Sequence, residues 1–263
     1  MLNIIVCIKQ VPGTTQVEID PKTGVLKRSA AAAKMNPYDL YAIETAMVLK
    51  EKYGADTTAL TMGPPYSEAV LREAFMLGID HGVLLTDRAF GGADCLATSY
   101  ALSQAIKALG IPDLVLCGKQ TTDGDTAQVG PELSEWLNLP AAVNVIRFKE
   151  VKDSSFIAEI DLGSVTQVIE IQKPCLMTVE KDIFEPRLPS YKKKVLTKNI
   201  PIRTLTLKDM QDQDLNHYGL NGSPTRVVKV FPPVHDTVNE VWQGSPDETA
   251  GRLADLIIKN KFA

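Results

Sequence analysis

The chain has 263 residues, of which 44% are hydrophobic and 23% are charged, and its formal net charge is −4. A chain of this length can bury one large core, or one core with appendages, and the negative charge argues against nucleic acid as the main partner. No apolar run reaches the roughly 18 residues that a membrane-spanning helix needs. The first residues carry neither a basic leader nor a small-residue cleavage site, so we expect a cytoplasmic protein without a signal peptide.

The cysteines and histidines restrict the chemistry further. The cysteines form no Cys-x-x-Cys pair and sit in apolar segments, which is typical of reduced, buried thiols; they are Cys7, Cys95, Cys117 and Cys175. The three histidines are scattered along the chain, so we expect no metal site.

The first 140 residues alternate short apolar runs with amphipathic segments. The apolar runs predict buried strands over residues 2–8, 57–62, 83–85 and 114–117. Helices are expected between them, one opening with Asn36 as N-cap and Pro37 at its first position, one capped by Ser67, and one over residues 94–109. Strands separated by helices of this length imply right-handed crossovers, so the predicted fold class is α/β, with a doubly wound and mostly parallel sheet.

The pattern changes after residue 140. Four β-rich runs predict antiparallel strands added to the sheet or lying beside it, over residues 143–148, 156–161, 165–171 and 175–179. Residues 185 to about 233 show little periodicity and are expected to form an extended arm. Ser245 to Glu248 is a capping box that opens a last helix. We therefore predict an α/β nucleotide-binding domain over residues 1–184, and a docking loop, arm and C-terminal helix over residues 185–263.

The loop between the strand at 114–117 and the next helix is the most informative segment. It is polar, rich in small residues, and ends near a helix N-terminus, where unpaired N–H groups and the helix dipole favour a phosphate. Pro131 cannot lie inside a regular helix that starts at Thr126, so either the first turn is distorted or the helix begins near Gly130. Both options leave N–H groups free for a ligand. The alternative is an ordinary loop with Asp125 as N-cap.

Three other segments are expected at the same edge of the sheet, over residues 7–12, 62–64 and 86–98. In the last of these, Gly91 and Gly92 would let the backbone approach a planar ring, and Arg88 could place a positive charge near it. The alternative is a flexible loop with Asp94 as N-cap. The chain has no Gly-x-Gly-x-x-Gly after its first strand, no P-loop lysine and no nucleophile elbow, so the residues predict a held nucleotide cofactor and no side-chain nucleophile.

Five stretches, in the same order along the chain, resemble the β subunit of electron transfer flavoprotein. They are Val6 to Pro12, Met35 to Asp39, Met62 to Pro64, Gly118 to Gly130, and Glu185 to Pro189. The resemblance implies a Rossmann-like domain of the adenine-nucleotide-hydrolase type, a partner α subunit that carries FAD, and a nucleotide in the β subunit. The implied cofactor-binding residues are Cys7, Asn36, Pro37, Tyr38, Asp39, Met62, Arg88, Gly91, Gly92, Ala93, Asp94, Thr98, Gly118, Lys119, Gln120, Thr121, Thr122, Asp123, Gly124, Asp125, Thr126, Ala127, Gln128 and Val129.

The loop also bears on the subtype. Ordinary family members, which hold AMP, tend to read Asp-Asp-x-Asn-Gln-Thr-Gly, whereas this chain has the smaller Gly124, Thr126 and Ala127. In this it resembles the electron-bifurcating branch, whose β subunit binds a second FAD that takes a hydride from NADH. That branch implies ferredoxin or flavodoxin as one electron acceptor and, through the α-subunit FAD, a flavoprotein dehydrogenase of acyl-CoA, enoyl-CoA or hydroxy-acid type as the other. The alternatives are a non-bifurcating β subunit with AMP and a stand-alone nucleotide-binding module.

A short stretch near residue 188 resembles the docking loop of the family. There Leu188 would insert into the dehydrogenase, and Tyr191 would flank the contact. The lysines at 192–194 could belong to the same docking patch, although a solvated lysine run is the commoner explanation.

Overall fold

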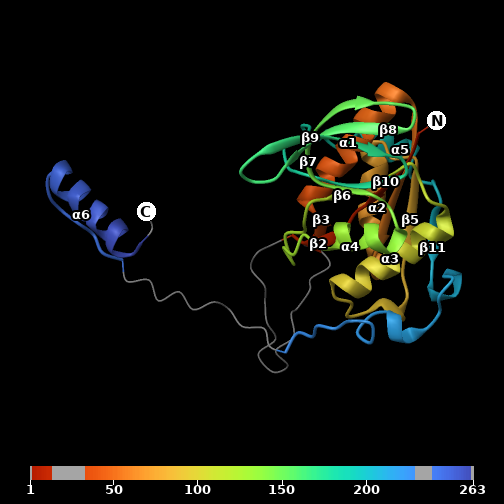
Figure 1. Ribbon diagram of the computed structural model, residues 1–263. Helices are drawn as coiled ribbons and strands as arrows, with labels where there is room; N and C mark the ends of the chain where they lie inside the picture. The colour runs from red at the N-terminus through yellow and green to blue at the C-terminus, as the bar shows by residue number, and fades with distance from the viewer. Residues whose placement is uncertain (1, 14–32, 229–238, 262–263) are drawn as a thin grey trace. The chain divides into compact units, whose positions relative to one another are not determined.

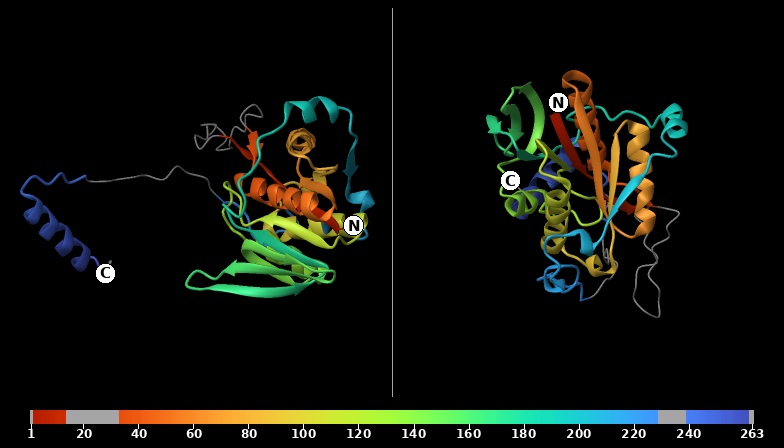
Figure 2. Two further views of the ribbon diagram at one scale, coloured as in Figure 1. Left: turned by 90° about the horizontal axis from the view of Figure 1, so that it is seen from above. Right: turned by 90° about the vertical axis from the view of Figure 1, so that its right-hand side faces the viewer.

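The computed structural model describes residues 2–13, 33–228 and 239–261. Contacts divide the chain into two compact units, residues 1–228 and residues 229–263. The first unit is built around one nine-stranded sheet with helices on both faces (Figures 1 and 2). This arrangement confirms the predicted α/β class.

The sheet has the strand order β11-β5-β4-β1-β6-β10-β7-β8-β9. Neighbouring strands are parallel from β11 to β7, and the pairs β7–β8 and β8–β9 are antiparallel. The strand bounds are β1 Leu2–Cys7, β4 Ala55–Met62, β5 His81–Leu85, β6 Leu114–Gly118, β7 Ala141–Val151, β8 Ser155–Asp161, β9 Thr166–Gln172, β10 Cys175–Val179 and β11 Ile202–Leu205. A separate antiparallel pair consists of β2 Gln10–Pro12 and β3 Ala33–Met35.

The helices follow the predicted start and stop signals closely. Their bounds are α1 Pro37–Tyr53, α2 Glu68–Leu77, α3 Cys95–Leu109, α4 Val129–Leu137, α5 Tyr191–Leu196 and α6 Pro246–Lys259, with 3₁₀ turns η2 Pro65–Ser67, η3 Arg88–Phe90, η4 Leu207–Asp209 and η5 Leu215–His217. Pro37 opens α1 after Asn36, as predicted, and Gly78 is the residue at which α2 ends. The capping box of α6 is also present, with Ser245 accepting from the Glu248 N–H.

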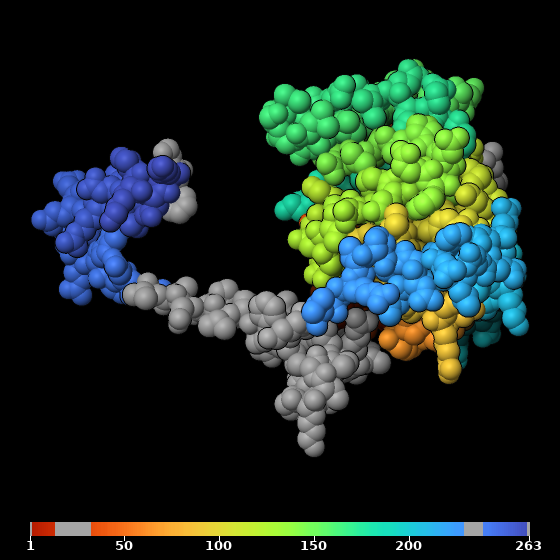
Figure 3. All heavy atoms as spheres, turned by 60° about the horizontal axis from the view of Figure 1, so that its bottom comes forward, coloured from red at the N-terminus to blue at the C-terminus, as the bar shows by residue number. Residues whose placement is uncertain are grey.

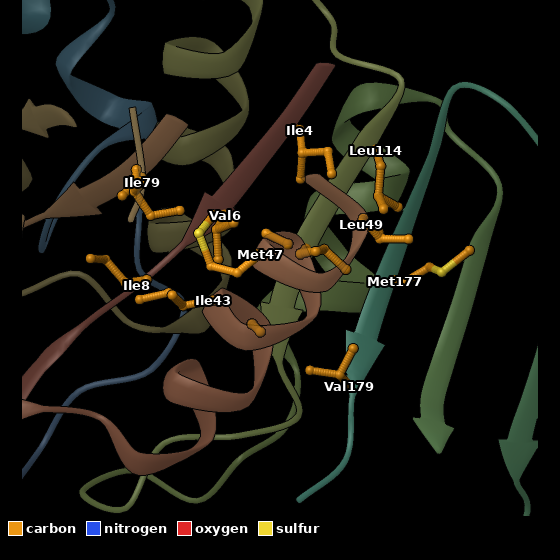
Figure 4. Packing of buried hydrophobic residues seen from close by; sticks show 14 of the residues in the cluster. Ile4, Val6, Ile8, Ile43, Met47, Leu49, Ile79, Leu114, Met177 and Val179 are labelled. Atoms are coloured by element: carbon orange, nitrogen blue, oxygen red, sulfur yellow. The ribbon is translucent and has the colours of Figure 1, made fainter. Parts of the chain in front are cut away.

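Two apolar clusters, one on each face, hold the helices to the sheet. On one face α1 and α2 pack on the sheet, and Figure 4 shows Met47 of α1 beside Val6 of β1, and Ile43 of α1 beside Ile8. On the other face α3 and α4 bury side chains such as Ile106 against the same central strands. Because the central strands are covered on both faces, they read as continuous apolar runs, which is why the sequence predicts them well.

The prediction of an antiparallel strand at 175–179 is wrong. Strand β10 is parallel and lies between β6 and β7, in the middle of the sheet. All five of its residues are buried, so the strand needs cover on both faces and neighbours on both sides. The three strands β7, β8 and β9 do form the predicted antiparallel addition.

Part of the predicted arm belongs to the core of the first unit. Strand β11 pairs with β5 and completes one edge of the sheet, although its four residues show no clear period in the sequence. Beyond it, Met210 and Tyr218 are buried against α3, and Figure 3 shows this blue segment lying across the yellow α3 region. Residues 229–233 of the predicted arm, and His235, lie outside the described residues.

Candidate nucleotide site

The four predicted segments meet at the carboxyl ends of β1, β4, β5 and β6. The Lys9 Nζ lies 2.8 Å from Asp123 Oδ1, which joins the segment after β1 to the loop after β6. Cys95 Sγ lies 3.1 Å from Thr126 Oγ1, which joins the start of α3 to the same loop. The Gly63 N–H donates to the Leu85 carbonyl and so ties the end of β4 to that of β5. Open α/β sheets bind ligands at this edge.

The loop from 118 to 128, here called the ligand loop, starts at a glycine with no room for a side chain. A Cβ on Gly118 would lie 2.6 Å from Asp39 Oδ1 and 2.7 Å from the Tyr38 carbonyl carbon. Further on, Asp125 and Ala127 have φ values of 54° and 53°, the left-handed region that non-glycine residues rarely adopt. Such backbone strain clusters at functional sites because the surrounding structure must over-determine it.

The ligand loop ends at α4, which begins at Val129 with Pro131 as its third residue. This is the second of the two predicted arrangements, and Gln128, in place of Asp125, occupies the N-cap position. The N–H groups of residues 126–130 donate no hydrogen bond to another described residue. Free N–H groups at a helix N-terminus, next to left-handed backbone, are suited to an anion such as a phosphate.

Two side chains beneath the ligand loop are engaged inside the protein. Asn36 is fully buried; its Nδ2 donates to Asp39 Oδ1 at 2.8 Å and to the Gln120 carbonyl at 2.9 Å, and its Oδ1 accepts from the Thr122 N–H at 3.2 Å. Asp39 is 4% exposed, and its Oδ2 accepts from the Lys9 N–H at 2.7 Å. Asn36 therefore holds the N-cap position of α1 but turns its side chain to the loop. No signal in the sequence distinguishes this use of Asn36 from ordinary capping.

The two carboxylates of this region titrate differently. Burial raises the pKa of Asp39 to about 7, against the opposing hydrogen bonds from Asn36 and Lys9. Burial also acts on Asp123, but the hydrogen bond and the charge of Lys9 outweigh it and hold the pKa of Asp123 below its usual value. Lys9 thus neutralises the carboxylate that would otherwise oppose an anion in the loop.

The segment from 86 to 98 forms the turn η3 and the start of α3. Arg88, Gly91 and Gly92 are exposed, and the Arg88 side chain makes no ion pair with another described residue. Asp94 is the predicted N-cap of α3 and accepts from the Ala97 N–H at 3.1 Å. Asp94 therefore caps α3, and its place at the edge of the sheet also agrees with the prediction that it lies in the site.

Sequence reasoning missed the segment that supports this turn. The Leu220 N–H donates to the Gly91 carbonyl at 3.0 Å, and Thr225 Oγ1 donates to Asp94 Oδ2 at 2.8 Å. A Cβ on Gly219 would lie 2.2 Å from the Ala89 carbonyl oxygen, so this contact requires glycine. The close pair Gly219 and Gly222 was the signal in the sequence that could have indicated it.

Two further predicted site residues, Met62 and Cys7, lie at the ends of strands. Met62 is half-buried at the end of β4, and Cys7 is buried at the end of β1 beside Cys117 of β6. All four cysteines are free, although Cys95 is only half-buried.

Among the described residues no cluster of His, Cys, Asp or Glu could hold a metal ion. None of the helices in the same part of the chain is long and apolar enough to cross a membrane.

The predicted docking residues are far more exposed than the site. Leu188 is 87% exposed and Tyr191 is 77% exposed. The backbone beside them is fixed: the Ser190 N–H donates to the Met76 carbonyl at 3.1 Å, and Arg187 forms ion pairs with Glu44 and Glu51. The stretch is thus an apolar surface on a rigid support.

The sheet is doubly wound, and the ligand loop at its strand ends leads into the N-terminus of α4. These two features place the chain in the class of Rossmann-like α/β proteins. The family model of the electron transfer flavoprotein domain matches residues 23–209. The electron transfer flavoprotein subunit beta of Thermoanaerobacterium thermosaccharolyticum is 42% identical over 257 residues, which cover 97% of this chain and 98% of that one. The chain belongs to the electron transfer flavoprotein family.

Two further relatives are subunits of reductase complexes. The caffeyl-CoA reductase-Etf complex subunit CarD of Acetobacterium woodii is 41% identical, over 97% of this chain and 98% of that one. The acryloyl-CoA reductase electron transfer subunit gamma of Anaerotignum propionicum is 38% identical, over 98% of both chains. The predicted family resemblance is confirmed, and family membership favours electron transfer over the stand-alone nucleotide-binding module.

Proposed function

We propose that this chain is the β subunit of an electron-bifurcating electron transfer flavoprotein and that its ligand loop holds FAD. The observation that carries the proposal is the row of N–H groups at 126–130, which donate to no other residue in the described part of the chain, next to left-handed Asp125 and Ala127. This donor set fits a diphosphate, and Lys9 offsets the charge of Asp123 beside it.

The residues of the chain would act as follows. The N–H groups of the loop would bind the diphosphate, and Arg88 would lie near the ring. The absence of a side chain at Gly124 and the short side chain of Thr126 would leave space for the rest of the dinucleotide. When bound there, FAD would supply hydride chemistry with NADH and one-electron transfer to ferredoxin or flavodoxin and to the α-subunit FAD. The protein would contribute binding, orientation and electrostatic tuning.

The partners follow from the same proposal. The chain would pair with an α subunit and deliver electrons to a flavoprotein dehydrogenase, with Leu188 and Tyr191 in the contact. The names of two relatives, which include caffeyl-CoA reductase and acryloyl-CoA reductase, support an acyl-CoA or enoyl-CoA type of dehydrogenase over a hydroxy-acid type.

The second candidate is a β subunit that holds AMP and only relays electrons, because the same N–H groups fit a single phosphate. To separate the two, the chain is co-purified with its α subunit, the complex is denatured, and FAD and AMP are quantified per heterodimer. Two FAD and no AMP would support bifurcation. One FAD with one AMP would overturn it and leave the simple carrier.

A further inference from the structure

Asp39 is a buried carboxylate that the proposed function leaves without a role. It lies under the ligand loop, in contact with Gly118, and it accepts hydrogen bonds from the Lys9 N–H and from Asn36 Nδ2. Its side chain is 4% exposed, so a nucleotide in the loop would not replace these contacts.

The ionised carboxylate fixes which way the Asn36 amide faces. A carboxylate can only accept hydrogen bonds, so the Asn36 NH₂ must face Asp39, and the same NH₂ group donates to the Gln120 carbonyl. The Asn36 Oδ1 is then left to accept from the Thr122 N–H. Both the nitrogen and the oxygen of the fully buried Asn36 amide thus have hydrogen-bond partners.

Protonation of Asp39 would reverse this matching. Oδ2 accepts from the Lys9 N–H, and Asn36 Nδ2 now donates to Oδ1, so a proton on Oδ1 can be donated to Asn36 only if the amide rotates to offer its oxygen. The rotated amide places NH₂ against the Thr122 N–H and oxygen against the Gln120 carbonyl. Both contacts with the ligand loop are lost, and the fully buried Asn36 amide is left facing groups with which it cannot form hydrogen bonds.

We propose that Asp39 is a positioning residue that sets the conformation of the ligand loop through Asn36. When Asp39 is ionised, Asn36 is hydrogen-bonded to the loop; when Asp39 is protonated, Asn36 releases the loop. The inference rests on the proposed function only in naming an adenine nucleotide as the ligand of the loop. The hydrogen-bond relay itself is a property of the protein alone.

The charges around Asp39 place the switch in an accessible pH range. Lys9, after β1, favours the ionised form, and Asp123, in the loop, opposes it. Cys117 of β6 also faces Asp39; its hydrogen bond with Cys7, together with burial and the charge of Asp39, raises the pKa of the Cys117 thiol, so it stays neutral there. Lys119 pairs with Glu180. Burial outweighs the other effects and raises the pKa of Asp39 to about 7.

The first test follows the relay without any ligand. The amide NMR signal of Thr122 is recorded in the full chain between pH 6 and 8. We expect its shift to titrate in the wild type and to be constant in Asp39→Asn. The controls Glu73→Gln and His217→Asn remove two other groups with raised pKa values and should keep the titration. A Thr122 signal that is constant in the wild type overturns the relay, even if Asp39→Asn fails to fold.

The second test measures affinity in the heterodimer with the α subunit. AMP and FAD are titrated at pH 6 and pH 8 into complexes stripped of nucleotide. If only the ionised form binds, the wild-type affinity falls about tenfold from pH 8 to pH 6, and the Asp39→Asn affinity does not change. Equal pH dependence in both proteins overturns the role in binding. A wild type that binds neither nucleotide while Thr122 titrates would overturn the proposed function and leave the relay standing.

Discussion

Gly118 shows how one missing side chain shapes the ligand loop. The loop leaves β6 so close to the first turn of α1 that a Cβ at this position would overlap with Asp39 and Tyr38. The closest atoms are buried carboxylate and backbone, which cannot move aside as the end of a flexible side chain could. The glycine is therefore required by packing, in addition to any role in binding.

We expect Gly118→Ala to destabilise the first unit by about 2 kcal/mol, as overpacking does, and to lower the nucleotide content of the purified complex. Urea denaturation and nucleotide quantification measure the two effects. Gly124→Ala is the matched control for stability, because its Cβ would meet only Thr121 Oγ1 at 3.5 Å, an ordinary contact. Equal losses of stability in the two variants would contradict the packing argument.

Asp39 also predicts a pH dependence of stability. Its pKa is about 7 in the folded chain and 3.8 in an unfolded one, so between these values the folded state holds a proton that the unfolded state has released. Stability from this group is therefore present below pH 4 and is lost as the pH rises through 7. Relative to Asp39→Asn, the wild type should lose on the order of 4 kcal/mol over this range. Denaturant titrations at several pH values measure the two stabilities, and a wild type that keeps or gains stability relative to Asp39→Asn as the pH rises from 4 to 8 would contradict the prediction.

Arg88 gives a prediction about the cofactor. An exposed guanidinium without an ionic partner among the described residues is free to stabilise a reduced, anionic flavin. Arg88→Leu should lower the two-electron potential of the β-subunit flavin by about 30 mV, equivalent to about 1.4 kcal/mol. Redox titration of the complex measures this. A variant that keeps its flavin at an unchanged potential would show that Arg88 does not act on the ring.

At the scale of elements, α5 and the stretch before it form a rigid apolar surface. Leu188 and Tyr191 are largely exposed, and the ion pairs of Arg187 hold the backbone against α1. Because the support is already ordered, docking costs little conformational entropy.

Leu188→Ala should therefore weaken electron delivery to the dehydrogenase by at least about tenfold, as loss of a central apolar contact does. NADH oxidation by a dye, measured on the same preparation, should not change. Val195→Ala, an exposed apolar truncation on the adjoining helix α5, is the control and should have a smaller effect. A loss of both activities with Leu188→Ala would argue against docking.

The elements also show what the sequence could predict. The strands β1, β5 and β6 appear as short apolar runs and β4 as a threonine-rich run, so their positions were predicted within about two residues. Strand β11 has four residues at a sheet edge, too few to show a period. The direction of β10 was missed because direction depends on which strands surround it, which no local pattern records.

The site was predicted at the level of segments and not of contacts. Asn36 and Ser67 were both expected as caps, and both occupy the N-cap position without a capping hydrogen bond. Their side chains bind the ligand loop and Gln10 instead. Tertiary hydrogen bonds outcompeted local ones, and a single sequence shows only the local choice.

At the scale of the whole chain, the residues that back the site come late in the sequence. Gly219 to Thr225 support the turn that carries Arg88 and Gly91, and Tyr100 donates to Asp212 beside them. A chain that ends at residue 200 would lose β11 and all of this support, whereas one that ends at residue 228 retains the first compact unit. We expect the shorter chain to lose nucleotide binding and the longer one to retain it. Comparable binding by both chains would show that the support is dispensable.

This arrangement has a consequence during synthesis. A ribosome makes on the order of 5–20 residues per second and releases the amino end first. The loops that would hold the nucleotide emerge in the first half of translation, but the turn at 88–92 has no backing until residues 219–225 have left the exit tunnel. For several seconds the nascent chain would carry a nearly complete sheet with an unfinished site. Cofactor loading would then be a late event, close in time to the meeting with the α subunit.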